Sequence, residues 1–292
     1  MSDKPQMGLD LGLPEGADNL KVPKKIIKTG STVVSQATLD TIPERMSSPP
    51  HAMAELQQIS AAGADLSLAE MAKLLDADPN YRVIQRLVPA LHFRPVVQTQ
   101  QGNVQRVAVL DTETTGLSAA ADVIIELAVV VMDIDTSTGL PVGDVLVFDG
   151  FQDPGRAIPQ EVQLLTGISN EMVAGQALDE DAISKIMEGV QWVVAHNAGF
   201  DRPFVEQRLP YFADLAWACS FADIPWKKHG VGSAKLESLA AHYGWFYDAH
   251  RADMDCHALA AVMGQHVGET GKTGWRLLLE AVKAPQYKLQ AT

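Results

Sequence analysis

The chain has little cysteine, and it lacks a hydrophobic run long enough to cross a membrane. Its two cysteines, Cys219 and Cys256, cannot by themselves form a disulfide framework or a four-ligand zinc site, and they fit a reducing cytoplasm. The longest apolar stretch, residues 123–132, contains Glu126 and is too short for a membrane span. The first residues show no basic-then-apolar pattern, so we expect neither a signal peptide nor a membrane partner.

Positive charge is also scarce. With 23 Lys and Arg against 36 Asp and Glu, the net charge is −13. A protein that coats duplex DNA without sequence preference needs Lys and Arg to neutralise phosphates, so this class is disfavoured. A nuclease is not excluded, because a site that gathers carboxylates stays acidic until metal ions neutralise it.

The N-terminal third of the chain differs in composition from the rest. Residues 1–65 are rich in Pro, Gly, Ser, Lys and Asp and show little periodicity, which predicts a disordered tail. Residues 66–104 are expected to form a short helical lead-in that docks on the main domain. Its two helices are expected at residues 66–75 and 81–87.

Residues 105–270 are expected to form the main domain, because apolar strands alternate there with amphipathic helices. The expected strands cover residues 106–111, 122–132, 145–152 and 192–196, and the expected helices cover residues 161–165, 179–188, 202–209, 234–243 and 252–266. Such alternation predicts the α/β class, with a mixed β-sheet flanked by helices. Residues 271–292 are expected to hold a C-terminal helix at 275–282 and a tail.

Two carboxylates, Asp111 and Glu113, stand one residue apart at the end of the apolar run 107–110. Such a run is typical of a buried strand, on which residues i and i+2 point to the same face. Asp111 and Glu113 are therefore expected to project together into one small volume. Like charges held that close raise each other's pKa unless a cation lies between them. The pair thus predicts a divalent metal ion and metal-dependent phosphoryl transfer.

Two further clusters combine carboxylates with histidine. One runs from His196 to Asp201, where an apolar strand ends and a helix begins, and the other runs from His250 to Asp255, at the start of a helix. In α/β proteins, ligands bind beyond strand ends and at loop–helix junctions. Each of the three clusters lies at such a place.

These residue types suit phosphodiester hydrolysis. The reaction needs an activated water, a neutralised phosphate and a stabilised leaving oxygen, and two divalent ions about 3.5–4 Å apart can supply all three. Hard cations such as Mg²⁺ and Mn²⁺ prefer oxygen ligands. A neutral histidine, with an ordinary pKa of about 6.5, can accept a proton from the attacking water. The chain contains the required set of four carboxylates and one histidine: Asp111, Glu113, Asp201, Asp255 and His250.

Three motifs occur in a fixed order. They are Asp111-Thr112-Glu113-Thr114-Thr115-Gly116-Leu117, then His196-Asn197 with Phe200-Asp201, then His250 followed by Asp255 with four residues between them. Together with segments 124–128 and 158–168, they resemble the DnaQ-like (DEDDh) 3'-5' exonuclease family, whose members include proofreading epsilon subunits of bacterial DNA polymerase III and RNA-trimming enzymes. The resemblance covers residues 105–267 and implies a ribonuclease-H-like fold.

The resemblance implies a role for individual residues of these motifs. Two divalent metal ions, Mg²⁺ or Mn²⁺, would be held by Asp111, Glu113, Asp201 and Asp255. Asp111 would bridge both ions, and His250 would be the general base. Contacts to the terminal nucleotide are implied for Thr112, Thr114, Leu117, Glu161, Thr166 and Asn197. Family members often have histidine at the position of Thr166, a departure that affects the sugar or base contact and not the metal site.

Some of these residues also suit another interpretation. Asp201 could be only the N-cap of the helix that follows it. Asp253 competes with Asp255, but residues two apart on a helix do not share a face, and the spacing from His250 selects Asp255. A basic patch is expected to be a solvated loop, with contact to the substrate backbone as the alternative; it consists of Lys227, Lys228, His229 and Lys235.

Three functions remain open at this point. The leading hypothesis is a 3'-5' exonuclease that releases nucleoside 5'-monophosphates from single-stranded or frayed DNA, in proofreading or repair and with a polymerase or other replication protein as partner. The second is trimming of RNA 3' ends, because the motifs do not encode contacts to the 2'-hydroxyl. The third is an interaction module of a replication or repair complex, with the N-terminal tail and the C-terminal helix as docking peptides.

Overall fold

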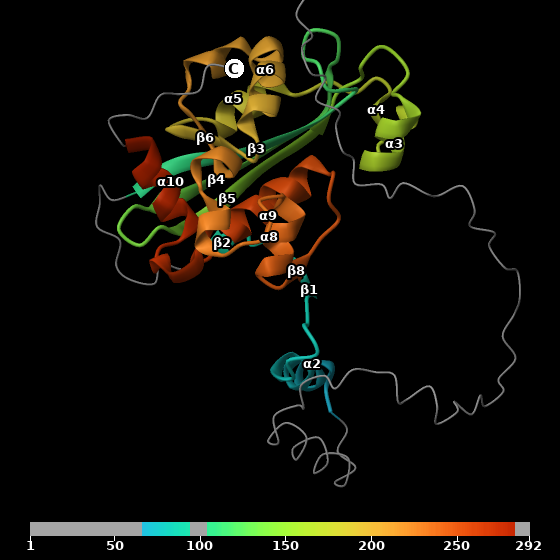
Figure 1. Ribbon diagram of the computed structural model, residues 1–292. Coiled ribbons are helices and arrows are strands. Elements are labelled where there is room, and N and C mark those ends of the chain that lie inside the picture. Colours follow the sequence, from blue (N-terminus) through green and yellow to red (C-terminus); the bar gives the residue numbers. More distant parts are fainter. Residues whose placement is uncertain (1–65, 94–103, 284–292) are drawn as a thin grey trace, which may run out of the picture.

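A six-stranded sheet forms the centre of the molecule. The computed structural model describes residues 66–93 and 104–283 (Figure 1), so the expected tail at 1–65 and the end of the chain after residue 283 lie outside the described residues. The strand order is β2-β5-β4-β3-β6-β7. These strands are β2 (His92–Phe93), β3 (Val104–Thr114), β4 (Ile124–Asp135), β5 (Leu140–Phe151), β6 (Trp192–Ala195) and β7 (Trp217–Cys219). The first four in this order pair antiparallel and the last two join in parallel, which confirms the expected mixed sheet.

Helices cover both faces of this sheet (Figure 1). One face packs against α8 (Leu236–His242), α9 (Ala252–Met263) and α10 (Gly274–Lys283), and the other packs against α5 (Glu180–Ile186) and α6 (Ala198–Arg208). The connections contain α3 (Gln160–Thr166), α4 (Asn170–Val173), α7 (Ser220–Asp223) and the 3-10 helices η3 (Pro210–Asp214), η4 (Trp226–His229) and η5 (Gly268–Thr270). The predicted α/β class, with a mixed sheet flanked by helices, is confirmed. Within the described residues, no helix combines the length and the apolar character needed to cross a bilayer.

Strand β4 is apolar from Leu127 to Met132 because both of its faces are covered there. Ala128, Val130 and Met132 face one core and the residues between them face the other, so both faces of the strand are covered and neither needs polar residues. Pairing of β4 with β5 continues to the last pair, Asp135 with Leu140. Both strands therefore extend beyond the expected ranges 122–132 and 145–152, because the hairpin adds pairs that the hydrophobic pattern does not mark.

Helix α9 lies close to the middle of the sheet because small side chains face each other there. The Cys256 thiol lies 3.6 Å from the carbonyl oxygens of both Val109 and Ala128. Burial raises the pKa of the Cys256 thiol well above its usual range, so this thiol serves packing and is not a reactive nucleophile. The close approach brings the first turn of α9 next to the end of β3.

The lead-in contains one helix where the sequence predicted two. Helix α2 (Leu68–Ala77) forms as expected and begins with a capping box between Ser67 and Glu70. The helix expected at residues 81–87 is wrong: this segment is extended, and β1 (Gln85–Arg86) pairs in parallel with β8 (Trp245–Phe246). Tertiary contacts cause this difference. The segment pairs with β8, and the Arg82 guanidinium donates to main-chain carbonyls, so these bonds replace the local hydrogen bonds of a helix.

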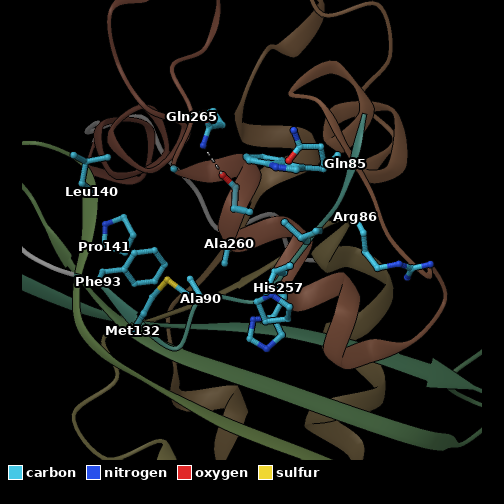
Figure 2. A pocket seen from close by; sticks show the side chains of 16 residues that line it. Gln85, Arg86, Ala90, Phe93, Met132, Leu140, Pro141, His257, Ala260 and Gln265 are labelled. Atoms are coloured by element: carbon cyan, nitrogen blue, oxygen red, sulfur yellow. Dashed lines mark hydrogen bonds between the residues drawn. The ribbon is translucent and has the colours of Figure 1, made fainter. Parts of the chain in front are cut away.

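The lead-in also docks on the second half of α9. Together they enclose a pocket of about 530 Å³. Its lining includes the side chains of Phe93, Met132, Pro141 and His257 (Figure 2). The side chain of His257 is 8% exposed. This pocket shares no lining residue with the carboxylate clusters, so the lead-in contributes to the fold away from the candidate site.

The C-terminal helix α10 is an integral part of the same core. It was expected at residues 275–282 and it forms at Gly274–Lys283. Trp275 is fully buried and Leu278 nearly so. The Thr273 hydroxyl donates a hydrogen bond of 2.7 Å to the carbonyl of Gly139 in the β4–β5 turn. The helix therefore closes the core instead of projecting from it.

Candidate active site

The end of β3 presents two carboxylates on the face that α9 covers. Asp111 and Glu113 alternate with Thr112 along the strand, as the sequence predicted. Asp255, in the first turns of α9, joins them, and one carboxylate oxygen from each of the three residues lies within 4.8 Å of the others. The first and third motifs therefore meet, although 144 positions separate Asp111 from Asp255 in the numbering.

Asp255 is held by two hydrogen bonds from its own neighbourhood. The Tyr247 hydroxyl donates to one carboxylate oxygen at 2.7 Å, and the backbone N–H of His250 donates to the other at 2.9 Å. His250 has a φ of 62°, a conformation that is uncommon for residues other than glycine. The chain turns sharply there, and the imidazole of His250 lines the same pocket as the carboxylates.

Asp201 approaches from the opposite layer of the fold. It lies within α6, whose N-cap is Asn197, so the capping interpretation of Asp201 is wrong. Its carboxylate instead accepts hydrogen bonds from the backbone N–H and the hydroxyl of Thr112, at 3.1 and 2.8 Å. Asp201 and His250 line one pocket together with the other three predicted carboxylates. The four carboxylates and the histidine therefore occur at one site.

The site strongly disfavours negative charge. Burial raises the pKa of Asp111 well above its usual range, and repulsion by the neighbouring carboxylates raises it further. Burial and the same repulsion raise the pKa of Glu113 to about 8, and burial raises that of Asp201 to about 7. Oxygen donors crowded in this way fit hard divalent cations, which would neutralise them. The residues present thus suit the metal ions that the sequence predicted.

The pocket has a volume of about 270 Å³, and one part of its lining forms an apolar wall. This wall is formed by Leu117, Val162 and Leu165, of which Leu117 is 63% exposed. Among the expected substrate contacts, the lining residues are Thr112, Thr114, Leu117 and Thr166, whereas Glu161 and Asn197 are exposed and do not line this pocket.

All three of these threonines use their hydroxyls within the protein, and that of Thr112 donates to Asp201 as described above. The Thr166 hydroxyl donates to the carbonyl of Val162 at 2.9 Å and accepts from the N–H of Ile168 at 3.1 Å. The Thr114 hydroxyl donates to the carbonyl of Gly116 at 2.6 Å. Both side chains therefore stabilise the backbone around the pocket.

His196 is a structural histidine that directly follows the buried strand β6. Its Nε2 donates to the carbonyl of Ala234 at 2.8 Å, so the unprotonated Nδ1 accepts from the Ser220 hydroxyl at 2.9 Å. Burial lowers the pKa of His196 to about 4. A neutral ring therefore ties the end of β6 to the loop before α8.

Three residues next to the site were not recognised from the sequence. Tyr247 has no spacing that marks it. Glu126 was noted only as part of the apolar stretch 123–132 and of the family-like segment 124–128, and Arg251 was assigned no role. Glu126 and Arg251 form an ion pair with an N–O distance of 2.6 Å. Asp149 and Asp253 lie beside this pair, so Asp253 belongs to this second group and not to the first.

The chain is similar in sequence to known exonucleases and DNA polymerase III proteins. The RNase_T exonuclease family model matches residues 108–263. The DNA polymerase III subunit epsilon of Treponema pallidum is 30% identical over 168 residues, covering 53% of this chain and 75% of that protein. PolC-type DNA polymerase III of Clostridium perfringens is 32% identical over 162 residues, and the 3'-5' exonuclease DinG of Bacillus subtilis is 31% identical over 169 residues. The matched region covers 53% and 55% of this chain but only 11% and 17% of those two proteins.

Two solved structures match part of this chain with low overall similarity. Exonuclease I of E. coli in complex with a dA16 oligonucleotide has a TM-score of 0.43 and 19% sequence identity, covering 55% of this chain and 40% of that one. Exonuclease X in complex with 5' overhanging duplex DNA has a TM-score of 0.39 and 23% identity, covering 60% of this chain and 99% of that one.

Proposed function

The chain belongs to the RNase_T exonuclease family, and from this membership we propose that it is a metal-dependent 3'-5' exonuclease that acts on single-stranded or frayed DNA. Its products would be nucleoside 5'-monophosphates. The observation that carries the proposal is the convergence of Asp111, Glu113 and Asp255 within 4.8 Å, with Asp201 and His250 lining the same pocket.

Two divalent ions, Mg²⁺ or Mn²⁺, fit this donor set. They would be held by Asp111, Glu113, Asp201 and Asp255. When bound, such ions neutralise the scissile phosphate and make the attacking water more acidic. The protein prepares the ligands for this task, because Thr112 fixes the carboxylate of Asp201 and Tyr247 fixes that of Asp255.

His250 is the proposed general base. It is exposed at the rim of the pocket, so its imidazole can accept the proton of the attacking water and release it to solvent. The apolar wall formed by Leu117, Val162 and Leu165 would flank the base of the terminal nucleotide. Glu161 and Asn197, for which the resemblance implies contacts to the terminal nucleotide, lie outside this pocket.

DNA is the favoured substrate because the relatives include two kinds of DNA polymerase III protein. The same relatives make a replicative polymerase the favoured protein partner. RNA remains the second candidate substrate, since recognition of the 2'-hydroxyl separates the two nucleic acids and is set by individual contacts.

The decisive experiment compares the wild-type protein with Asp111→Asn on 5'-labelled single-stranded DNA and RNA, in Mg²⁺, Mn²⁺ or EDTA. We expect a metal-dependent ladder that shortens from the 3' end and is absent with Asp111→Asn. His250→Ala should lower the rate by about 10²–10⁴-fold. Asp133→Asn serves as the control, because Asp133 pairs with Arg106 at the far end of the same strands. Cleavage by Asp111→Asn at the wild-type rate would exclude this mechanism.

A further inference from the structure

Three residues form a row across the sheet beside the active site. Glu113 on β3 is the direct partner of Glu126 on β4, and Glu126 is the direct partner of Phe151 on β5. Directly opposed residues of antiparallel strands point to the same face. The candidate metal ligand Glu113, the carboxylate of Glu126 and the ring of Phe151 therefore share the face that α9 covers.

Arg251 lies over this row. Its Nε and one terminal nitrogen donate to Glu126 at 3.1 and 2.6 Å, and its guanidinium carbon lies 5.6 Å from the centre of the Phe151 ring. The second carboxylate oxygen of Glu126 accepts the backbone N–H of Ala252, the first residue of α9, at 2.9 Å. Glu126 thus holds both the side chain of Arg251 and the helix N-terminus that follows it.

A buried carboxylate in a central strand needs an explanation, because removing a charge from water is costly unless it is paired. Glu126 is 0% exposed, and its neighbours Leu127 to Val131 on the strand are all apolar. An apolar residue would pack there at lower cost. Packing alone therefore does not account for the charge, whereas anchoring of Arg251 and Ala252 does.

The anchored residues stand directly after His250. On the other side, the N–H of His250 is bonded to the Asp255 carboxylate. The left-handed backbone of His250, with φ of 62°, is thus fixed between two attachments. We propose that the buried Glu126–Arg251 pair is a positioning device that sets the place of the His250 imidazole relative to the metal-binding carboxylates. This inference rests on the function proposed above.

The test uses the full chain and two substitutions that preserve size. Arg251→Lys keeps the positive charge but cannot make the forked contact, and Glu126→Gln keeps the shape but removes the charge. Each is made in the wild-type protein and in His250→Ala, and Asp133→Asn on the same strand is the matched control. The readouts are kcat and KM on single-stranded DNA, calorimetric Mn²⁺ affinity, and amide hydrogen exchange of the segment 249–256.

We expect Arg251→Lys and Glu126→Gln to lower kcat by about 10- to 100-fold, with KM and Mn²⁺ affinity changed by less than about threefold. Because the pair acts through His250, either substitution should cost less than about twofold in the His250→Ala protein. Exchange in segment 249–256 should be faster in both variants and unchanged in Asp133→Asn.

Equal losses of kcat with and without His250, or unchanged exchange in segment 249–256, would overturn the inference. If Glu126→Gln does not fold, Arg251→Lys still tests the inference. The Arg251 side chain is 33% exposed, so we expect this substitution to leave the protein folded. A wild-type protein that cleaves nothing would instead refute the proposed function. In that case the exchange measurement alone decides whether the pair fixes the His250 segment.

Discussion

Two hydrogen bonds from Thr112 end on the same carboxylate oxygen of Asp201, one from the backbone N–H at 3.1 Å and one from the hydroxyl at 2.8 Å. Thr112 is on the central strand β3 and Asp201 is on helix α6, so these bonds join two layers of the fold at the site. They also favour the charged form of Asp201 and partly offset the burial that raises its pKa. Thr112 therefore supports the metal site whether or not it touches a nucleotide.

Replacing Thr112 with Val should weaken metal binding. The substitution keeps the shape and the N–H but removes the hydroxyl, so the pKa of Asp201 rises and its orientation is less fixed. We expect the Mn²⁺ affinity to fall about 10-fold, as measured by titration calorimetry at pH 7. Thr112→Ser, which restores the hydroxyl, is the control and should bind Mn²⁺ nearly as well as the wild type. Equal Mn²⁺ affinities of the Thr112→Val protein and the wild type would show that this hydrogen bond does not affect metal binding.

The metal-free protein should lose stability as pH rises. The folded-state pKa values of Glu113, about 8, and Asp201, about 7, lie above the values of about 4 expected in the unfolded chain. Between these limits the folded state binds more protons, so the free energy of unfolding falls with increasing pH. Urea denaturation in EDTA at pH 5, 6.5 and 8 measures this slope.

Two controls belong to that measurement. Glu113→Gln removes one of the titrating groups, so its stability should depend less on pH than that of the wild type. Saturating Mn²⁺ should stabilise the wild-type protein most at pH 8, where its carboxylates are ionised. A metal-free stability that rises from pH 5 to 8 in the wild type and in Glu113→Gln alike would contradict the assignment.

His196 should give the opposite pH dependence. Its folded-state pKa of about 4 lies below the value of about 6.5 in an unfolded chain, so its contribution is present above pH 6.5 and is lost as pH falls toward 4. The stability difference between wild type and His196→Gln should therefore shrink by about 2 kcal/mol from pH 7 to pH 5. His229→Gln, at the end of η4, is the control. A difference that stays constant with pH would show that His196 is not held neutral.

The sequence predicted which residues come together at the end of β3 where the signal is local. Asp111 and Glu113 share a face because strand periodicity requires it, and both lie at the end of an apolar run that is typical of a buried strand. The helices around Asp201 and Asp255 were also predicted, although α6 begins at Ala198, four residues before the expected start at 202. The first turn of α6 follows Asn197, whose backbone is left-handed. Helix propensity does not reveal such a start.

The unpredicted features depend on partners that are far apart in sequence. Arg251 contacts Glu126 across 125 positions, and neither residue has a spacing that links it to the other. The segment 81–87 was predicted as a helix, but its backbone pairs with β8, about 160 positions away. β7 has only three residues, too few for an alternation to be recognised. Tertiary pairing decides such segments, and local propensity is overridden.

The last prediction concerns Trp275, which anchors α10 in the core. Its side chain is fully buried, and its indole N–H is one of two buried side-chain atoms in the described residues without a hydrogen-bond partner. Trp275→Ala should cost about 3–5 kcal/mol of stability, because it leaves a large cavity. Trp275→Phe should cost much less, since it keeps an aromatic ring and removes an unsatisfied donor. Glu280→Ala on the exposed face of the same helix removes only surface ion pairs, so it should cost less than about 1 kcal/mol. Urea denaturation of the three variants measures these differences. A Trp275→Ala protein as stable as Glu280→Ala would show that α10 does not contribute to the stability of the core.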